Sequence, residues 1–143
     1  MQIRNSIALV TGANRGIGRA LVNALLQAGA KKVYAGTRDL SSLNTAKFID
    51  MARVVPISID ITNREGVRAL PDKAPDVNLL INNAGVLDFG NIMPKTAPAD
   101  IAAAVVAGIA AGQEDIFPDA MSAGLYAAWK TDHKSVEKQF AAM

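Results

Sequence analysis

The stretch "LVTGANRGIGRAL" (residues 9–21) joins an apolar run to a helix-like run, and it decides the fold of the chain. Thr11, Gly12, Gly16 and Gly18 give the spacing TGxxxGxG. We expect Gly12 to make a tight turn, Gly16 to let the backbone approach a pyrophosphate, and Gly18 to let helix and strand pack closely. The free N–H groups and the dipole of the helix would then face the phosphates. A glycine-rich turn without a ligand is the alternative, but the strand–turn–helix context favours a phosphate loop.

Short apolar runs and helix-like runs alternate over the first 85 residues. The apolar runs are rich in branched residues, which is typical of buried parallel strands, whereas the other runs carry apolar residues at helical spacing. Strand–helix–strand repeats with short connections indicate a parallel sheet with right-handed crossovers. The sequence therefore predicts an α/β fold, a Rossmann-like parallel sheet with flanking helices. We predict strands at residues 6–10, 32–36, 54–59 and 77–81, and helices at residues 16–30, 40–51 and 62–70.

The pattern changes after residue 85. Residues 86–98 contain two prolines and no clear period, so we predict a loop there, followed by a helix over residues 99–112. We predict a short further strand at "DIF" (115–117) and terminal helices over 119–130 and 133–143. The chain of 143 residues has the size of one domain. We therefore expect a single truncated domain over residues 1–143, with about four to five strands.

Composition and charge exclude several classes of function. Hydrophobic residues make up 50% of the chain and charged residues 20%, which indicates a packed globular protein. The net charge of +2 comes from scattered basic residues, so no feature favours nucleic-acid binding. The chain has no cysteine, and the lone His133 lies in a polar stretch, so we expect no metal site. The longest apolar run, residues 101–112, is too short to cross a bilayer, and the first residues lack a cleavable signal pattern. We expect a cytoplasmic protein that does not bind a membrane.

Two further motifs follow the third and fourth predicted strands. "SIDIT" (58–62) contains Asp60, and "NNAG" spans residues 82–85. Together with TGxxxGxG, these motifs resemble the short-chain dehydrogenase/reductase family. The resemblance implies that Asp60 contacts the adenine ring of a dinucleotide and that NNAG supports the sheet and lines the nicotinamide-ribose side. A helix cap is the alternative for Asp60, and a plain turn is the alternative for NNAG. The cofactor-binding residues that the resemblance implies are Gly12, Asn14, Arg15, Gly16, Ile17, Gly18, Thr37, Arg38, Asp60, Ile61, Asn83, Ala84 and Gly85.

The end of the second strand indicates which nicotinamide cofactor fits. NAD-binding proteins usually carry an acidic residue there for the ribose 2′-hydroxyl. Here Thr37 takes that position, Arg38 follows it, and Arg15 lies in the glycine loop. Arginine makes charge-assisted bonds to phosphate, and the family uses basic residues to hold the 2′-phosphate, so the sequence favours NADP(H) over NAD(H). Asp39 is the competitor, because it would either bind a 2′-hydroxyl or cap the following helix.

The resemblance also covers the end of the chain but leaves out the middle of the family's sequence. Residues 1–92 correspond to the nucleotide-binding part. Residues 93–143 are similar to the last helix, last strand and tail of bacterial members. Between these parts, family members carry a strand with a catalytic serine and a helix with a catalytic tyrosine and lysine. The chain has no room for either segment.

"YAAWK" (126–130) nevertheless matches the family's YxxxK. On a helix, Tyr126 and Lys130 share one face, and a lysine beside a tyrosine can make the phenol a proton donor. The surrounding sequence favours a different interpretation, in which Tyr126 and Trp129 pack a terminal helix and Lys130 is solvated. Tyr126 and Lys130 are therefore candidate catalytic residues whose structural role is the favoured alternative.

Three functions are compatible with the sequence. The first is an NADP(H)-dependent oxidoreductase with a reduced catalytic apparatus, limited to slow hydride transfer to dyes, quinones or carbonyls. The second is a non-catalytic NADP(H)-binding or interaction module, and the third is a structural remnant that binds nothing. Because the strands beyond 77–81 and their covering helices are absent, we expect an exposed sheet edge and apolar face that a homodimer would cover.

Overall fold

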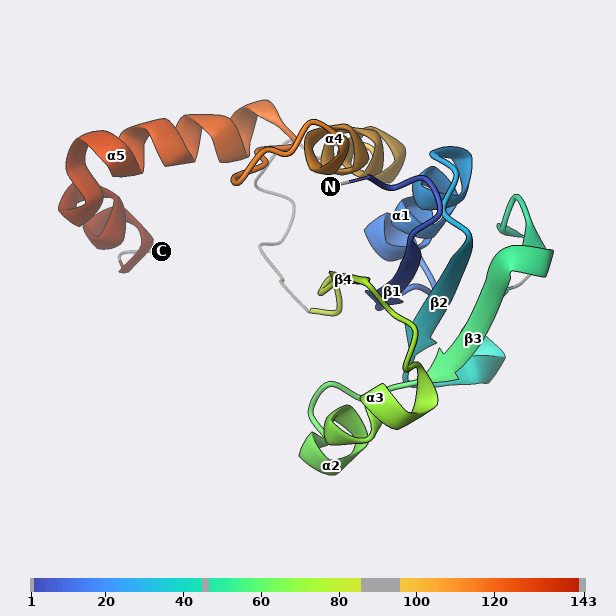
Figure 1. Ribbon diagram of the computed structural model, residues 1–143. Coiled ribbons are helices and arrows are strands. Elements are labelled where there is room, and N and C mark those ends of the chain that lie inside the picture. Colours follow the sequence, from blue (N-terminus) through green and yellow to red (C-terminus); the bar gives the residue numbers. More distant parts are fainter. Residues whose placement is uncertain (1, 45–46, 86–95, 142–143) are drawn as a thin grey trace.

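The computed structural model describes residues 2–44, 47–85 and 96–141, and its centre is one parallel sheet (Figure 1). The four strands in the described residues are β1 (Ile7–Thr11), β2 (Lys32–Thr37), β3 (Val54–Ser58) and β4 (Leu79–Ile81). Their order in the sheet is β3-β2-β1-β4, and every pair is parallel. The prediction of a Rossmann-like parallel sheet with flanking helices is confirmed.

The order of the strands reverses at β1. From β1 the chain moves outward through β2 to β3, and it then returns to place β4 on the other side of β1. In open α/β sheets, ligands bind beyond the carboxyl ends of the strands at such a switch point. The segments that follow β1 and β4, which carry TGxxxGxG and NNAG, therefore lie on the two sides of the expected binding crevice.

Two helices cover one face of the sheet. Ala8 and Val10 of β1 are completely buried on this face beneath α1 (Gly16–Gln27), whose Leu25 is also completely buried. α4 (Pro98–Ala110) packs along α1 (Figure 1) and joins the same core through Ala102. The predicted helix at 99–112 is confirmed, since α4 covers most of that range.

The opposite face of the sheet has little cover. Its buried cluster consists of Leu9, Tyr34, Ile57 and Ala74, and we call this side of the sheet the open face. α2 (Arg64–Arg68) and α3 (Leu70–Lys73) lie at one end of it (Figure 1).

The single helix predicted over 62–70 was wrong in its extent, because the chain forms α2 and α3 as two short helices. Pro71 lies in the first turn of α3, where a proline is tolerated because its missing N–H would have no intrahelical partner. Because Pro71 has no N–H to donate to a carbonyl oxygen of α2, that helix ends before Pro71 and α3 begins as a new one.

The helix predicted over residues 40–51 was also wrong in the described part of that range. The chain forms two 3-10 turns instead, η1 (Leu40–Ser42) and η3 (Met51–Arg53). Asp39 accepts a hydrogen bond from the N–H of Ser41, and Asp50 accepts one from the N–H of Ala52. Short polar side chains that bind nearby N–H groups favour turns over longer helices.

The strand predicted at "DIF" (115–117) is absent from the described residues. Ile116 packs instead against α4 at Gly108, where a Cβ atom would lie only 2.7 Å from Ile116 Cγ1. This contact keeps the segment beside the helices and away from the sheet edges. The described sheet therefore has four strands and no fifth.

The chain ends in α5 (Ala120–Ala141), which leads away from the sheet in Figure 1. Asp132 departs from helical geometry with φ −153°, which agrees with the prediction of two terminal helices. The last two residues of the second predicted helix, and most of the loop predicted at 86–98, lie outside the described residues. None of the helices in the described part combines the length and apolar character that a membrane span requires.

Candidate cofactor site at the carboxyl ends of the strands

The glycine loop forms a tight turn directly after β1. Gly12 has φ +68°, a conformation that favours glycine, and a Cβ atom on Gly18 would lie 2.1 Å from the carbonyl oxygen of Gly12. Helix α1 can approach the turn this closely only because Gly18 has no side chain. Gly16 differs from Gly18, since nothing beyond its chain neighbours and the backbone of its own helix lies within 4 Å of the position that its Cβ would take. The loop thus presents free space at Gly16, at the N-terminus of α1.

Thr11 joins the glycine loop to NNAG. Its hydroxyl oxygen accepts hydrogen bonds from the backbone N–H groups of Asn83 and Ala84, both at 2.9 Å. In return, the side-chain amide of Asn83 donates to the backbone carbonyl oxygens of Thr11 at 3.0 Å and Gly12 at 3.4 Å. Thr11 is 3% exposed, so these bonds are protected from water. The sequence identified Thr11 only as part of a spacing, although a hydroxyl at the end of a buried strand is a signal for such an anchor.

The residues that are expected to select the cofactor lie in the glycine loop and at the end of β2. Arg15 and Arg38 are exposed, whereas Thr37 is buried and donates its hydroxyl to the backbone carbonyl oxygen of Asp39 at 3.3 Å. The carboxylate of Asp39 accepts bonds from the hydroxyl and the N–H of Ser41, and these bonds lower its pKa. Asp39 therefore caps the turn that follows it, which is one of the two roles that the sequence left open for this residue.

A side-chain hydroxyl that the sequence did not reveal connects the glycine loop with the segment after β2. The amide of Asn14 donates to Ser42 Oγ at 3.3 Å, and the hydroxyls of Ser42 and Thr37 lie 3.3 Å apart. Ser42 also donates to the backbone carbonyl oxygen of Asp39. The bond from Asn14 to Ser42 joins the two loops that flank the expected position of the adenosine ribose.

Asp60 and Ile61 follow β3 at the same edge of the sheet. Asp60 Oδ1 accepts bonds from the hydroxyl of Thr62 at 2.7 Å and from its N–H at 2.9 Å. These bonds, with a smaller contribution from the charge of Arg38, hold the pKa of Asp60 below its ordinary value. The N-cap of α2 is Asn63, so Asp60 stabilises the turn before the helix and is not its cap. Ile61 is 47% exposed.

A groove of about 560 Å³ begins at this edge and continues across the open face. Thr11, Ile61 and Asn82 line the end that lies next to the glycine loop. Leu9 and Leu80 line the part that runs over the sheet. Of the predicted cofactor residues, Ile61 lines this groove, while Thr11 and Asn82 lie directly beside the glycine loop and NNAG.

Tyr126 and Lys130 lie together on α5. The ring of Tyr126 stacks on Phe117 at a centroid distance of 4.2 Å, and Lys130 Nζ lies 4.8 Å from the centroid of the Tyr126 ring. The Tyr126 hydroxyl is 3.4 Å from a carboxylate oxygen of Asp115. Ser122, on the same helix, donates its hydroxyl to the backbone carbonyl oxygen of Asp119. The structure brings the tyrosine and the lysine together, but on a helix that leads away from the glycine loop (Figure 1).

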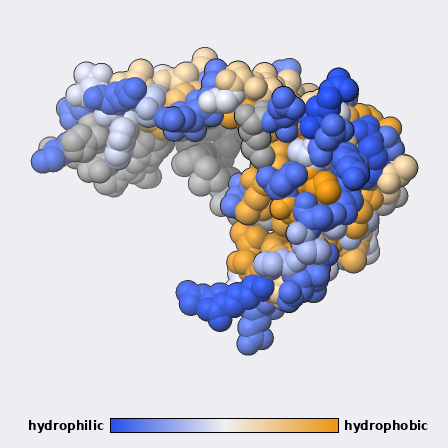
Figure 2. Space-filling model, in the orientation of Figure 1, coloured by the Kyte–Doolittle hydropathy of each residue, from blue (hydrophilic) through white to orange (hydrophobic). Residues whose placement is uncertain are grey.

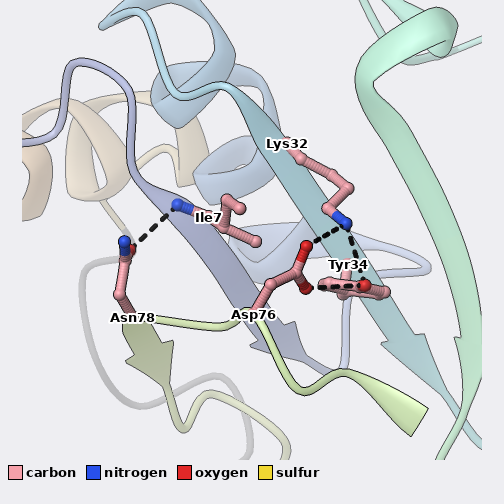
Figure 3. A network of polar contacts seen from close by, with 5 residues as sticks. All are labelled: Ile7, Lys32, Tyr34, Asp76 and Asn78. Atoms are coloured by element: carbon pink, nitrogen blue, oxygen red, sulfur yellow. Dashed lines mark hydrogen bonds and ion pairs between the residues drawn. The ribbon is translucent and has the colours of Figure 1, made fainter.

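A second tyrosine–lysine pair, which was not predicted from the sequence, lies on the sheet (Figure 3). Lys32 Nζ donates to the hydroxyl of Tyr34 at 3.0 Å, and that hydroxyl donates to Asp76 Oδ1 at 2.9 Å. The bond from Lys32 to Asp76 lowers the pKa of Asp76 and raises that of Lys32. Asn78 Oδ1 accepts a bond from the N–H of Ile7 at 2.9 Å. Lys32 and Tyr34 are two residues apart and share one face of β2, which was the available signal. The network fastens the segment before β4 to the middle of the sheet.

Within the described ranges, no group of three or more histidine, aspartate or glutamate side chains could hold a metal ion.

The match to known proteins covers the same elements. Residues 6–109 match the family described as short chain dehydrogenase. The chain therefore belongs to the short-chain dehydrogenase family.

Two curated relatives and one solved structure illustrate the similarity. The chain is 32% identical over 91 residues to the 3-oxoacyl-(acyl-carrier-protein) reductase FabG of Vibrio cholerae, which covers 60% of this chain and 36% of that protein. It is 33% identical over 106 residues to versicolorin reductase stcU of Emericella nidulans, covering 66% of this chain and 39% of the relative.

A short chain dehydrogenase from Burkholderia cenocepacia, whose crystal structure is in complex with NADP, is 44% identical with a TM-score of 0.55. The match covers 71% of this chain and 41% of that structure. The chain thus spans about two fifths of the length of the relatives that it matches.

Proposed function

We propose that the chain is an NADP(H)-binding domain whose cofactor site lies at the carboxyl ends of the four strands. The observation that carries this proposal is the anchored pair of segments at the switch point, where Thr11 joins the glycine loop to NNAG. The pyrophosphate would lie against Gly16, where the N-terminus of α1 offers free N–H groups and open space. The solved structure that is 44% identical and in complex with NADP supports the choice of ligand.

The cofactor residues take roles that follow from their positions. Asn14, Arg15, Ile17 and Gly18 belong to the loop and first turn under the phosphates, and Asp60 and Ile61 would contact the adenine ring. Asn83, Ala84 and Gly85 would line the nicotinamide-ribose side. Residues 1–92 would form this nucleotide-binding part and residues 93–143 the tail of one domain.

Arg38 and Arg15 would select NADP(H) over NAD(H). Both side chains are exposed at the edge that would receive the ribose 2′-phosphate, while Asp39 is engaged by Ser41. One charge-assisted hydrogen bond contributes about 1.5–3 kcal/mol, which corresponds to a preference of about ten- to hundredfold. NAD(H) would bind at the same site with lower affinity.

Fluorescence titration with NADPH and NADH tests the proposal directly. We expect tighter binding of NADPH, and we expect Arg38→Ala to remove most of the difference between the two cofactors. Arg4→Ala is the matched control, because Arg4 is also an exposed arginine but lies before β1, at the opposite end of the strand. Gly16→Val should abolish binding of both cofactors, because its side chain fills the space for the pyrophosphate and because φ is +55° at Gly16, a conformation that valine disfavours. Equal affinities of the unmodified protein for NADPH and NADH would refute the assignment.

The chemistry would be limited by the missing part of the family's sequence. Bound NADPH supplies a hydride, and the chain would orient the nicotinamide through NNAG. Without the serine strand and the tyrosine–lysine helix of the family, we expect slow reduction of broad acceptors such as dyes or quinones. The second candidate is a non-catalytic NADP(H)-binding module, which is favoured by the stacking of Tyr126 on Phe117 at the beginning of α5. Turnover of a dye acceptor with NADPH separates these two functions.

The protein would also form a two-fold homodimer. Leu80 on the edge strand β4 is 53% exposed and Val55 on β3 is 37% exposed, so the sheet presents apolar surface that monomers usually cover. Light scattering coupled to size-exclusion chromatography at micromolar concentration measures this state, and a stable monomer would contradict it.

A further inference from the structure

The open face carries an apolar groove that α2 and α3 close at one end only. Leu9 and Leu80 lie side by side on paired strands and line its floor, and Val67 and Leu70 line its wall. Leu80 is 53% exposed and Val67 is 39% exposed. Figure 2 shows hydrophobic surface on the side of the body where β4 forms the edge of the sheet. The groove has the size and lining of a site for apolar side chains.

The same chain presents an apolar stripe on the first part of α5. We call residues 120–131, which precede the break at Asp132, the arm. Met121 and Leu125 lie four residues apart, so they share one face of this helix, and they are 51% and 41% exposed. Two exposed surfaces of the same apolar character therefore belong to one chain, the groove and the arm.

We propose that the arm of one chain lies in the groove of a second copy, and that the second copy returns the contact through the two-fold axis of a dimer. This inference rests on the homodimer proposed above and names the segment that forms it. The arm would occupy the part of the groove lined by Leu80, Val67 and Leu70, whereas the cofactor would lie at the other end, beside Thr11 and Asn82.

The connection between α4 and α5 directs the arm to a second copy. α4 packs on α1, which is the face of the sheet opposite to the groove. Ile116 packs on Gly108 of α4, and Phe117 stacks on Tyr126 at the beginning of the arm. These contacts set the direction in which the arm leaves the body (Figure 1), and they would have to break before the arm could reach the groove of its own chain.

The area of contact also favours a reciprocal exchange. A helix of twelve residues is about 18 Å long and about 10 Å across, so its contact with a groove removes on the order of 500 Å² from water. One such contact is smaller than a specific interface requires, which is about 1,000 Å² in total. Two contacts related by a two-fold axis reach that value, and the dimer that they form is closed.

Charge substitutions test the two surfaces separately. The double variant Met121→Glu/Leu125→Glu changes the arm and Leu80→Glu changes the groove, and we expect each to give a monomer in light scattering. Ala123→Glu is the control, because it adds a charge of the same sign on a different, exposed face of the arm and should leave a dimer. Circular dichroism and NADPH titration of the same variants show whether the fold and the cofactor site are intact.

Cross-linking then identifies the contact, since the chain contains no cysteine of its own. Leu80→Cys protein grown on heavy nitrogen is mixed with unlabelled Leu125→Cys protein and treated with a short bis-maleimide. We expect a cross-link between residues 80 and 125 that joins a heavy and a light chain. If the arm and groove variants with glutamate substitutions remain dimers and this cross-link does not form, the arm exchange is wrong but the homodimer is not. A monomeric unmodified protein would overturn both, and NADPH binding reports on the cofactor proposal independently.

Discussion

The two tyrosines of the chain offer a comparison in which one chemical change should have two different effects. Tyr34 is 7% exposed, and its hydroxyl lies between Lys32 Nζ at 3.0 Å and Asp76 Oδ1 at 2.9 Å. Tyr34→Phe removes both bonds. The ion pair between Lys32 and Asp76 remains, and both partners still reach water, so the loss in the free energy of unfolding should be about 1 kcal/mol. For a domain of this size that change lowers Tm by about 4 °C.

Tyr126→Phe should have almost no effect on stability. The Tyr126 hydroxyl makes one long contact of 3.4 Å to Asp115, and phenylalanine would keep the stacking on Phe117. Its effect should stay within about 0.5 kcal/mol. Thermal unfolding followed by circular dichroism at neutral pH measures both variants. Equal losses, or a larger loss for Tyr126→Phe, would refute the structural roles assigned to the two residues.

The same pair of variants tests catalysis. If reduction of an acceptor by NADPH depends on the cofactor and not on a positioned phenol, Tyr126→Phe should leave the rate and the affinity for NADPH unchanged. A stereoselective reduction of a ketone that disappears in Tyr126→Phe would show that the residues 126–130 form a working active site.

Three further predictions concern the anchors of the site. Thr11→Val keeps the shape of a buried side chain but leaves two N–H groups of NNAG without an acceptor. We expect the free energy of unfolding, measured by denaturant titration, to fall by about 1–3 kcal/mol, and the affinity for NADPH, measured by fluorescence, to weaken. Gly18→Ala places a Cβ atom 2.1 Å from the carbonyl oxygen of Gly12, so it should destabilise the fold by about 1–3 kcal/mol in the same titration even without cofactor. The bond from Lys32 lowers the pKa of Asp76 in the folded state. The ionised carboxylate therefore stabilises the fold above the ordinary pKa of 3.8, and this stabilisation is lost as the pH falls through the lower folded-state pKa. We expect Asp76→Asn to make the fall of Tm between about pH 5 and about pH 2 less steep.

The sequence predicted the sheet and the glycine turn at its carboxyl edge because those features depend on local patterns. Branched apolar runs identified the four strands, and each predicted strand overlaps the observed one. The glycine spacing predicted the turn at Gly12 and the close packing at Gly18, since both follow from the absence of a side chain. Such features require no knowledge of distant residues.

The failures arose where distant or competing contacts decide the structure. Asp39 and Asp50 bind nearby N–H groups and replace a predicted helix with short turns. The contact of Ile116 with Gly108 removes a predicted strand, although the two residues lie on different segments. Periodicity could not reveal that Asp76 reaches across to Tyr34, because the contact depends on the packing of the sheet. The candidate site was therefore easier to predict than the bonds that anchor it.

The tie between Thr11 and Asn83 has a consequence for the order in which the chain folds. The two residues are 72 positions apart, whereas the pairing of β1 with β2 joins positions about 25 apart. The entropy lost on closing a loop grows with its length, so we expect β1, α1 and β2 to assemble before β4 inserts beside β1. A dinucleotide that needs both the glycine loop and NNAG can bind only after that last insertion. Its binding would then stabilise the completed sheet against partial unfolding, by about 2.7 kcal/mol at a hundredfold excess over Kd.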